Sequence, residues 1–212
     1  MRCTAFADDS KEAFMQTKKS IQKRMSTETM VLGAIMTALV IILQLLGSFT
    51  AFFGPFSTAV ALIPIAIGAI LCGPAIGAWL GFVFGVVVIA SGGAALFLAF
   101  DIPGTIVTVM VKGTACGFAA GWVYKLLKKW NGIVAAFAAA IVCPLVNTGL
   151  FLLGCAIFFL DDAVGIATAV ASPDAGMALF IGFAMANFLI EIATNTLLSP
   201  IFVRLLKIKK KV

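Results

Sequence analysis

Two charged residues, Lys112 and Glu191, lie deep inside apolar stretches of the chain. A charge near the centre of a bilayer costs at least roughly 2.5 to 3.5 kcal/mol, so such a residue usually faces a cavity or a partner. The chemistry open to Lys112 is to act as counter-ion to an anionic group. Glu191 can be the resting partner that keeps the lysine charged until an anion arrives.

Asparagines accompany these charges. Asn187, Glu191 and Asn195 are spaced four residues apart, so they share one helix face, which must point into a bundle and not at lipid. At 1.5 Å per residue, Lys112, Asn147 and Asn187 all lie roughly 12 to 20 Å below the outer membrane surface, and Glu191 lies about one turn deeper. The spacing therefore predicts one polar layer built from three segments.

This layer has two interpretations. It can hold a small polar ligand, with Lys112 bound to an anionic group and the asparagines bound to amides or hydroxyls. Alternatively, Lys112 pairs with Glu191 and the asparagines bridge helices without any ligand. We favour a ligand, because small residues alone can hold helices together. Gln44, in the first apolar stretch, is added to the expected substrate-binding residues.

The elements that position these residues are transmembrane helices. Of 212 residues, 62% are hydrophobic and 11% charged, against about 45 to 50% and 25% in a soluble domain. The net charge of +6 comes from basic residues at the edges of apolar spans, so we expect a lipid partner and no nucleic acid. The composition predicts an all-α membrane protein with a single membrane domain.

The expected domain organisation is simple. Residues 1–28 form a polar cytoplasmic segment, residues 29–207 a six-helix transmembrane domain, and residues 208–212 a basic cytoplasmic tail. Apolar windows bounded by glycine, proline or charge define the spans. They cover residues 30–48, 58–72, 74–90, 104–125, 132–159 and 177–206.

The stretch 58–90 can be one long helix or a hairpin that turns at Gly73–Pro74, where proline disfavours helix. With the hairpin, the basic runs near residues 18–24, 125–129 and 204–211 all lie on one side of the membrane, as the positive-inside rule requires. With a single helix, the run 125–129 lies outside. Charge parity thus predicts six crossings of the cell membrane and cytoplasmic termini.

Two features resemble interaction surfaces. The predicted outer loop 48–57 contains four phenylalanines, among them Phe49, Phe53 and Phe56, and it is either a lid over a binding site or a segment resting on lipid headgroups. Ala34 and Ala38 in the first span form a small-xxx-small pair that lets another helix approach closely. That helix is either a neighbour in the bundle or an external partner.

Several functions are disfavoured by what the sequence lacks. It has no histidine, its five cysteines show no CxxC spacing, and it contains no Gly-Lys dipeptide and hence no GxxxxGK[ST] phosphate loop. We therefore expect a protein that is not an enzyme, holds no metal or cofactor and does not itself use ATP. If it transports, energy must come from an ion gradient or another subunit.

Four features taken together match a known family of membrane proteins: the Ala34/Ala38 pair, the Phe-rich loop, and the segments 63–85 and 144–154. In these residues the chain resembles the substrate-binding S component of energy-coupling factor (ECF) vitamin transporters. The resemblance implies six helices, a vitamin site open to the outside under the loop, and docking through Ala34 and Ala38 onto a transmembrane T component. Two partner ATPases would then use the ATP.

Within this family the pattern looks most like pantothenate-type members. One lysine and two asparagines suit a carboxylate-bearing, hydroxylated, non-aromatic vitamin, whereas flat-ring vitamins would favour aromatic stacking. Riboflavin, folate and cobalamin stay open as substrates. Two other functions also stay open, an ion-coupled secondary transporter in which Glu191 carries the proton and a scaffold whose intramembrane charges are only structural.

Overall fold

The computed structural model describes residues 27–50, 60–98, 101–158, 185 and 188–197, except for the side chains of residues 49, 50 and 96. Contacts divide the chain into two units, residues 1–31 and 32–212. Only five residues at the end of the first unit are described, as the start of a helix. The account below therefore concerns the second unit.

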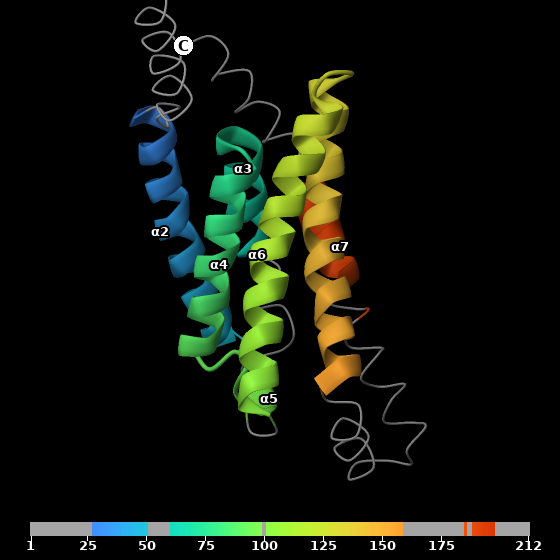
Figure 1. Cartoon of the computed structure of the whole chain (residues 1–212). Coiled ribbons are helices and arrows are strands. Elements are labelled where there is room, and N and C mark those ends of the chain that lie inside the picture. The colour runs from blue at the N-terminus through green and yellow to red at the C-terminus, as the bar shows by residue number, and fades with distance from the viewer. Residues whose placement is uncertain (1–26, 51–59, 99–100, 159–184, 186–187, 198–212) are drawn as a thin grey trace, which may run out of the picture. The chain divides into compact units, whose positions relative to one another are not determined.

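The described residues form helices and no strand. Figure 1 shows the long helices side by side, with their axes roughly aligned. The helices are α2 (Thr27–Thr50), α3 (Leu62–Cys72), α4 (Pro74–Ala90), the single turn α5 (Ala95–Leu98), α6 (Ile102–Leu127) and α7 (Gly132–Phe158). A further apolar helix covers Phe188–Leu197. Among them α2, α6 and α7 are long and apolar enough to cross a membrane.

Between Leu62 and Ala90 the chain forms two helices and not one. Gly73 separates them with φ of 98°, a left-handed value that favours glycine, and its N–H donates to the Ala69 carbonyl at the end of α3. Pro74 then opens α4, where its missing N–H removes no helical hydrogen bond. The glycine and proline together make the break that the sequence predicts at this point.

The start of α6 is set by Asp101. Its backbone is extended, and its carboxylate accepts a hydrogen bond of 3.1 Å from the Gly104 N–H. Pro103 follows in the first turn. An aspartate in this position satisfies one of the free N–H groups of the helix and complements its dipole. This cap fixes the end of α6 that lies opposite Lys125, Lys128 and Lys129.

Glycines bring α4 and α6 into backbone contact. A Cβ atom added at Gly81 would overlap the Gly113 carbonyl, and one added at Gly77 would overlap the Gly117 carbonyl. The two pairs follow opposite orders along the helices, so α4 and α6 are antiparallel. We call these four residues the glycine seam. Small residues permit such close approach between membrane helices, which otherwise lack a strong hydrophobic drive to associate.

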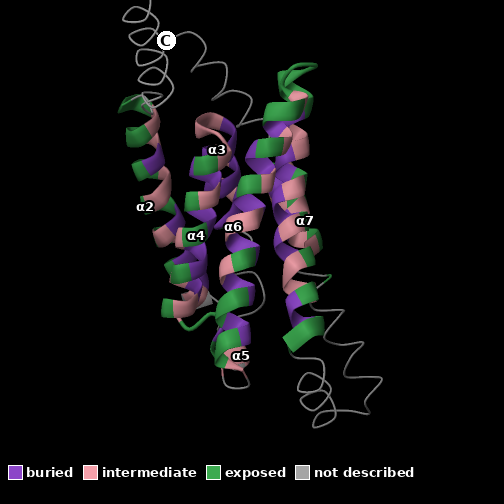
Figure 2. Cartoon of the chain, viewed as in Figure 1, coloured by how far each residue is buried: buried purple, intermediate pink, exposed green. Residues whose placement is uncertain are grey.

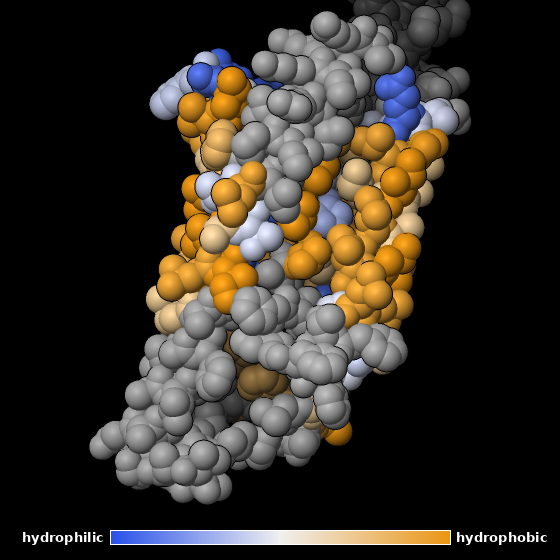
Figure 3. Space-filling view, turned by 180° about the vertical axis from the view of Figure 1, so that it is seen from behind, coloured by the Kyte–Doolittle hydropathy of each residue, from blue (hydrophilic) through white to orange (hydrophobic). Residues whose placement is uncertain are grey.

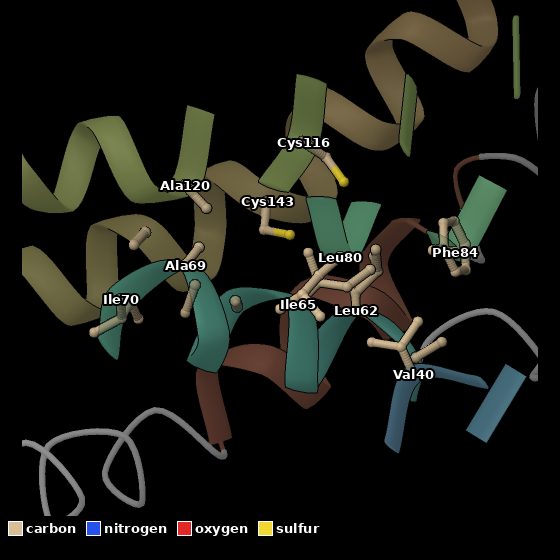
Figure 4. Close-up of a cluster of buried hydrophobic side chains, with 14 of the residues drawn as sticks. Val40, Leu62, Ile65, Ala69, Ile70, Leu80, Phe84, Cys116, Ala120 and Cys143 are labelled. Atoms are coloured by element: carbon tan, nitrogen blue, oxygen red, sulfur yellow. The ribbon is translucent and has the colours of Figure 1, made fainter. Parts of the chain in front are cut away.

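The core lies between these helices and α3 and α7. Figure 4 shows Leu62, Ile65 and Leu80 packed together, and all three are fully buried. The first half of α7 contributes only small side chains, which let α6 approach. They are Ala135, Ala136, Ala139, Ala140 and Cys143, each with no exposed surface. Pro144 follows inside the helix, before its polar residues.

The outer faces of the helices are also apolar. Figure 2 shows buried residues on the inner sides of the helices and exposed residues on the outer sides, and Figure 3 shows mostly apolar side chains on that outer surface. Exposed large hydrophobic residues include Ile106, Val111 and Phe118 on α6. Helices that are apolar all round are typical of membrane spans, so the pattern indicates a membrane protein.

The glycine seam predicts a steep cost for one added methyl group. We expect Gly81→Ala to lower the free energy of unfolding by about 2 kcal/mol, because the new Cβ must push α6 away. Gly149→Ala in α7 is the control, since a Cβ there meets nothing within 4 Å. Unfolding of the purified protein in mixed micelles measures both. Equal free energies of unfolding for the two variants would contradict the inference that α4 and α6 are in close contact at Gly81.

Candidate ligand-binding cavity

A cavity of about 160 Å³ lies between α4, α5, α6, α7 and the helix Phe188–Leu197. Its wall combines apolar and aromatic side chains with four polar ones, two of them ionisable. The lining residues are Val88, Gly93, Ala94, Phe97, Val109, Lys112, Asn147, Thr148, Phe151 and Glu191. A concave site of this composition is typical of small-molecule binding.

Lys112 enters the cavity from α6. It is only 9% exposed, and its Nζ lies 4.6 Å from the centroid of the Phe151 ring on α7. A desolvated ammonium over an aromatic face is attracted by the negative face of the ring. The lysine is therefore held within the cavity and does not reach towards lipid.

Glu191 enters the cavity from the helix Phe188–Leu197 and is fully buried. The Thr148 hydroxyl of α7 donates to its Oε2 over 3.3 Å. Asn195, one turn further along, donates from its side-chain amide to the Glu191 carbonyl over 3.0 Å. A buried carboxylate needs hydrogen-bond donors to offset its lost hydration, and Thr148 supplies one to the Glu191 side chain from a neighbouring helix.

Asn147 presents an unused acceptor. It is 4% exposed, and its Oδ1 has no hydrogen-bond partner in the part of the chain that the structure describes. An unsatisfied buried carbonyl costs roughly 1 to 3 kcal/mol. Because Asn147 lines the cavity, an N–H or O–H of a bound molecule can satisfy it.

Lys112, Asn147 and Glu191 thus meet on one cavity, although they come from three helices. Together they offer a cation, an amide and a carboxylate within an apolar surround. Such a set can bind a small molecule that carries an anionic group together with hydroxyl or amide donors. This set of side chains is suited to binding and orienting such a molecule.

Gln44 lies outside this lining. It is 1% exposed, and its side-chain amide donates to the Ser48 hydroxyl over 3.5 Å. Ser48 donates to Ser91 at the end of α4, over 2.8 Å, and Ser91 donates to the carbonyl of Val88, which lines the cavity. The structure therefore connects Gln44 to the cavity wall through two serines and does not place it on the wall.

The remaining expected site residues either lie away from the cavity or are not described by the structure. Ala34 and Ala38 are exposed on α2. Asn187, Phe53, Phe56 and the side chain of Phe49 lie outside the described residues, so the polar layer and the loop stay predictions there. Over the described ranges, no three His, Cys, Asp or Glu residues form a group suited to a metal ion.

Sequence reasoning missed Thr148, Phe97 and Phe151. A signal existed for two of them, because Thr148 follows Asn147 directly and Phe151 lies four residues beyond it, on the same helix face. No signal singled out Phe97, which packs edge-on against Phe151 with centroids 5.4 Å apart. In an apolar chain a phenylalanine facing a cavity looks the same as one facing lipid.

Apolar helices around a buried cavity that contains charged side chains are typical of membrane proteins that bind small polar molecules within the bilayer. The family model described as "ECF transporter, substrate-specific component" matches residues 28–203. The chain belongs to this family. It is therefore a substrate-binding component of an ECF transporter, with a small-molecule substrate and T-component and ATPase partners. Comparison with curated proteins and with solved structures gave no significant match.

The Thr148 contact predicts a stability effect. Thr148→Val keeps the shape of the side chain but removes one donor from the Glu191 carboxylate, so we expect the free energy of unfolding to fall by about 2 kcal/mol. Thr114→Val is the matched control, because among the described residues the Thr114 hydroxyl donates to a carbonyl of its own helix and to no charged group. Titration with SDS in mixed micelles compares the two. A loss no larger than that of the control would contradict the role of Thr148.

Proposed function

We propose that the chain captures pantothenate in the cavity between α6, α7 and Phe188–Leu197, and delivers it inward with the T component and two ATPases. The observation that carries the proposal is the presence of Lys112 and Asn147 on one buried cavity. It binds no cofactor itself in this scheme, and its partners use the ATP.

Each polar group has a matching part in this vitamin. The Lys112 ammonium pairs with the carboxylate, and the free Asn147 Oδ1 accepts from the amide N–H or a hydroxyl. The buried Glu191 carboxylate accepts from a further hydroxyl. Asn187, and the loop phenylalanines as a lid, complete the site in this proposal. Gln44 acts behind the wall, through Ser48 and Ser91.

The size of the cavity favours a small vitamin. Its volume of about 160 Å³ is below the roughly 300 to 1,000 Å³ of sites for drug-sized ligands. Folate and riboflavin are larger than pantothenate and carry flat rings, and cobalamin is much larger still, so all three need more room. They are the alternative substrates within the same family.

The proposed orientation places both chain ends in the cytoplasm with six crossings. Lys125, Lys128 and Lys129 follow the last turns of α6, and Asp101 caps the opposite end of that helix. Basic residues favour the cytoplasmic side. The start of α6 then lies outside, and the cavity lies on the side of Lys112 that faces the outer end of the helix.

Docking is proposed on α2. Ala34 and Ala38 are both exposed, and at a spacing of four residues they share one face. A helix of the T component can pack closely against two alanines, whereas larger side chains would keep it away.

Pantothenate binding should depend on the charge of Lys112. We expect Lys112→Met to weaken binding at least about 30-fold, because the carboxylate loses a desolvated counter-ion. Calorimetry on the purified protein measures the dissociation constant. Lys125→Met, which removes an exposed lysine from the end of the same helix, is the control and should leave binding unchanged.

Three outcomes would contradict this proposal. Tight binding of pantothenate by Lys112→Met would remove the assigned role of Lys112. Native mass spectrometry of the gently extracted protein tests the substrate itself, since a retained molecule of another mass would identify a different ligand. Uptake by vesicles containing this chain alone, driven by a proton gradient, would favour an ion-coupled transporter using Glu191.

Docking should depend on the small residues of α2. We expect the double variant Ala34→Leu, Ala38→Leu to lose co-purification with the T component and ATPases, because two isobutyl groups prevent close approach. Its pantothenate affinity should not change. Ala156→Leu, at an exposed alanine of α7, is the control and should retain the complex. Full assembly of the double variant would place the docking surface elsewhere.

A further inference from the structure

The aromatic pair in the cavity wall has no part in the function proposed above. Phe151 of α7 lies under the Lys112 ammonium, 4.6 Å from ring centroid to Nζ. Phe97 of α5 packs against Phe151 at an interplanar angle of 90°, with centroids 5.4 Å apart. All three residues line the cavity. The Lys112 ammonium therefore lies on the ring of Phe151, and the ring of Phe97 fixes the orientation of the Phe151 ring.

Lys112 has two attractive neighbours on the cavity, the face of Phe151 and the carboxylate of Glu191. A salt bridge with the carboxylate would occupy the N–H donors of Lys112 and cancel the net charge of the pair, and an incoming anion would then have to break that salt bridge. An ammonium held on an aromatic face stays charged, and its N–H groups that point away from the ring remain available to an anion. Phe151 thus offers Lys112 a resting position from which an anion can be bound directly.

We infer that Phe151 is a positioning residue for the ligand anion, and this inference rests on the proposed role of Lys112 in binding. Its ring holds the ammonium on the α7 side of the cavity, and Phe97 keeps that ring in the required orientation. Phe151 touches the lysine and acts on the ligand through it.

The same geometry narrows the ligand class. The face of Phe151 is occupied by the ammonium, so a flat ring cannot stack on it without displacing Lys112. The ligand that suits this arrangement presents a saturated, anionic end to Lys112. Flat-ring vitamins would have to compete with the lysine for the same face.

Fluorination of the ring tests the inference without changing its shape. Trifluorophenylalanine at position 151 weakens the negative face of the ring, so we expect pantothenate binding to fall about tenfold. The same replacement at Phe118, an exposed ring on α6 that contacts the ring of Trp122, is the control and should have no effect. Phe151→Leu and Phe151→Tyr give a genetic version of the series, with a loss expected only for leucine.

The double-mutant cycle with Lys112→Met separates positioning from packing. If Phe151 acts through the ammonium, fluorination lowers both the thermal stability of the ligand-free protein and pantothenate affinity only when Lys112 is present. The same loss in both backgrounds, or no loss in either, overturns the inference. Coupling in stability without coupling in affinity also overturns it, because the contact would then not serve the ligand.

Failure of the proposed substrate gives a different result. The unchanged protein would then not bind pantothenate at all, while the stability cycle would still report the contact between Lys112 and Phe151. The molecule retained in native mass spectrometry becomes the probe for the affinity cycle in that case, and the same criteria decide the inference.

Discussion

A charged side chain inside a bilayer has to find its partners within the protein, because neither lipid tails nor water can solvate it there. Lys112 and Glu191 meet this constraint on a single cavity, and much of the surrounding structure serves it. Phe151 faces the ammonium, and Thr148 donates to the carboxylate. Because both residues lie on α7, the position of that helix decides whether either charge is tolerated.

The position of α7 depends in turn on small residues. Its first half contacts its neighbours through alanines, whereas its second half carries Asn147, Thr148 and Phe151. Pro144 lies at the boundary between these halves and removes one helical N–H donor. The helix therefore combines a closely packed half, which fixes its place beside α6, with a half that leaves space for a ligand.

Sequence reasoning reached those parts of the structure that are physically exceptional. A charge within an apolar stretch is rare, so Lys112 and Glu191 stood out, and the Gly73–Pro74 pair marked the break between α3 and α4. The place of Phe97 in the cavity wall and the position of Gln44 could not be predicted. They depend on which turn of one helix lies beside which turn of another, and this register follows from backbone contacts such as Gly81 with Gly113. Hydropathy carries no information on that register.

The glycine seam and the cavity should tolerate different sequence changes during evolution. A cavity residue can change when the ligand changes, and exposed positions such as Val111 accept any apolar side chain that lipid tolerates. A side chain at Gly81 or Gly113 would push α4 and α6 apart, whichever molecule is carried. The spacing of these glycines is therefore a property of the scaffold, while the chemistry around Lys112, in the proposed function, is matched to the transported molecule. A relative that keeps the first and alters the second would be expected to transport something else.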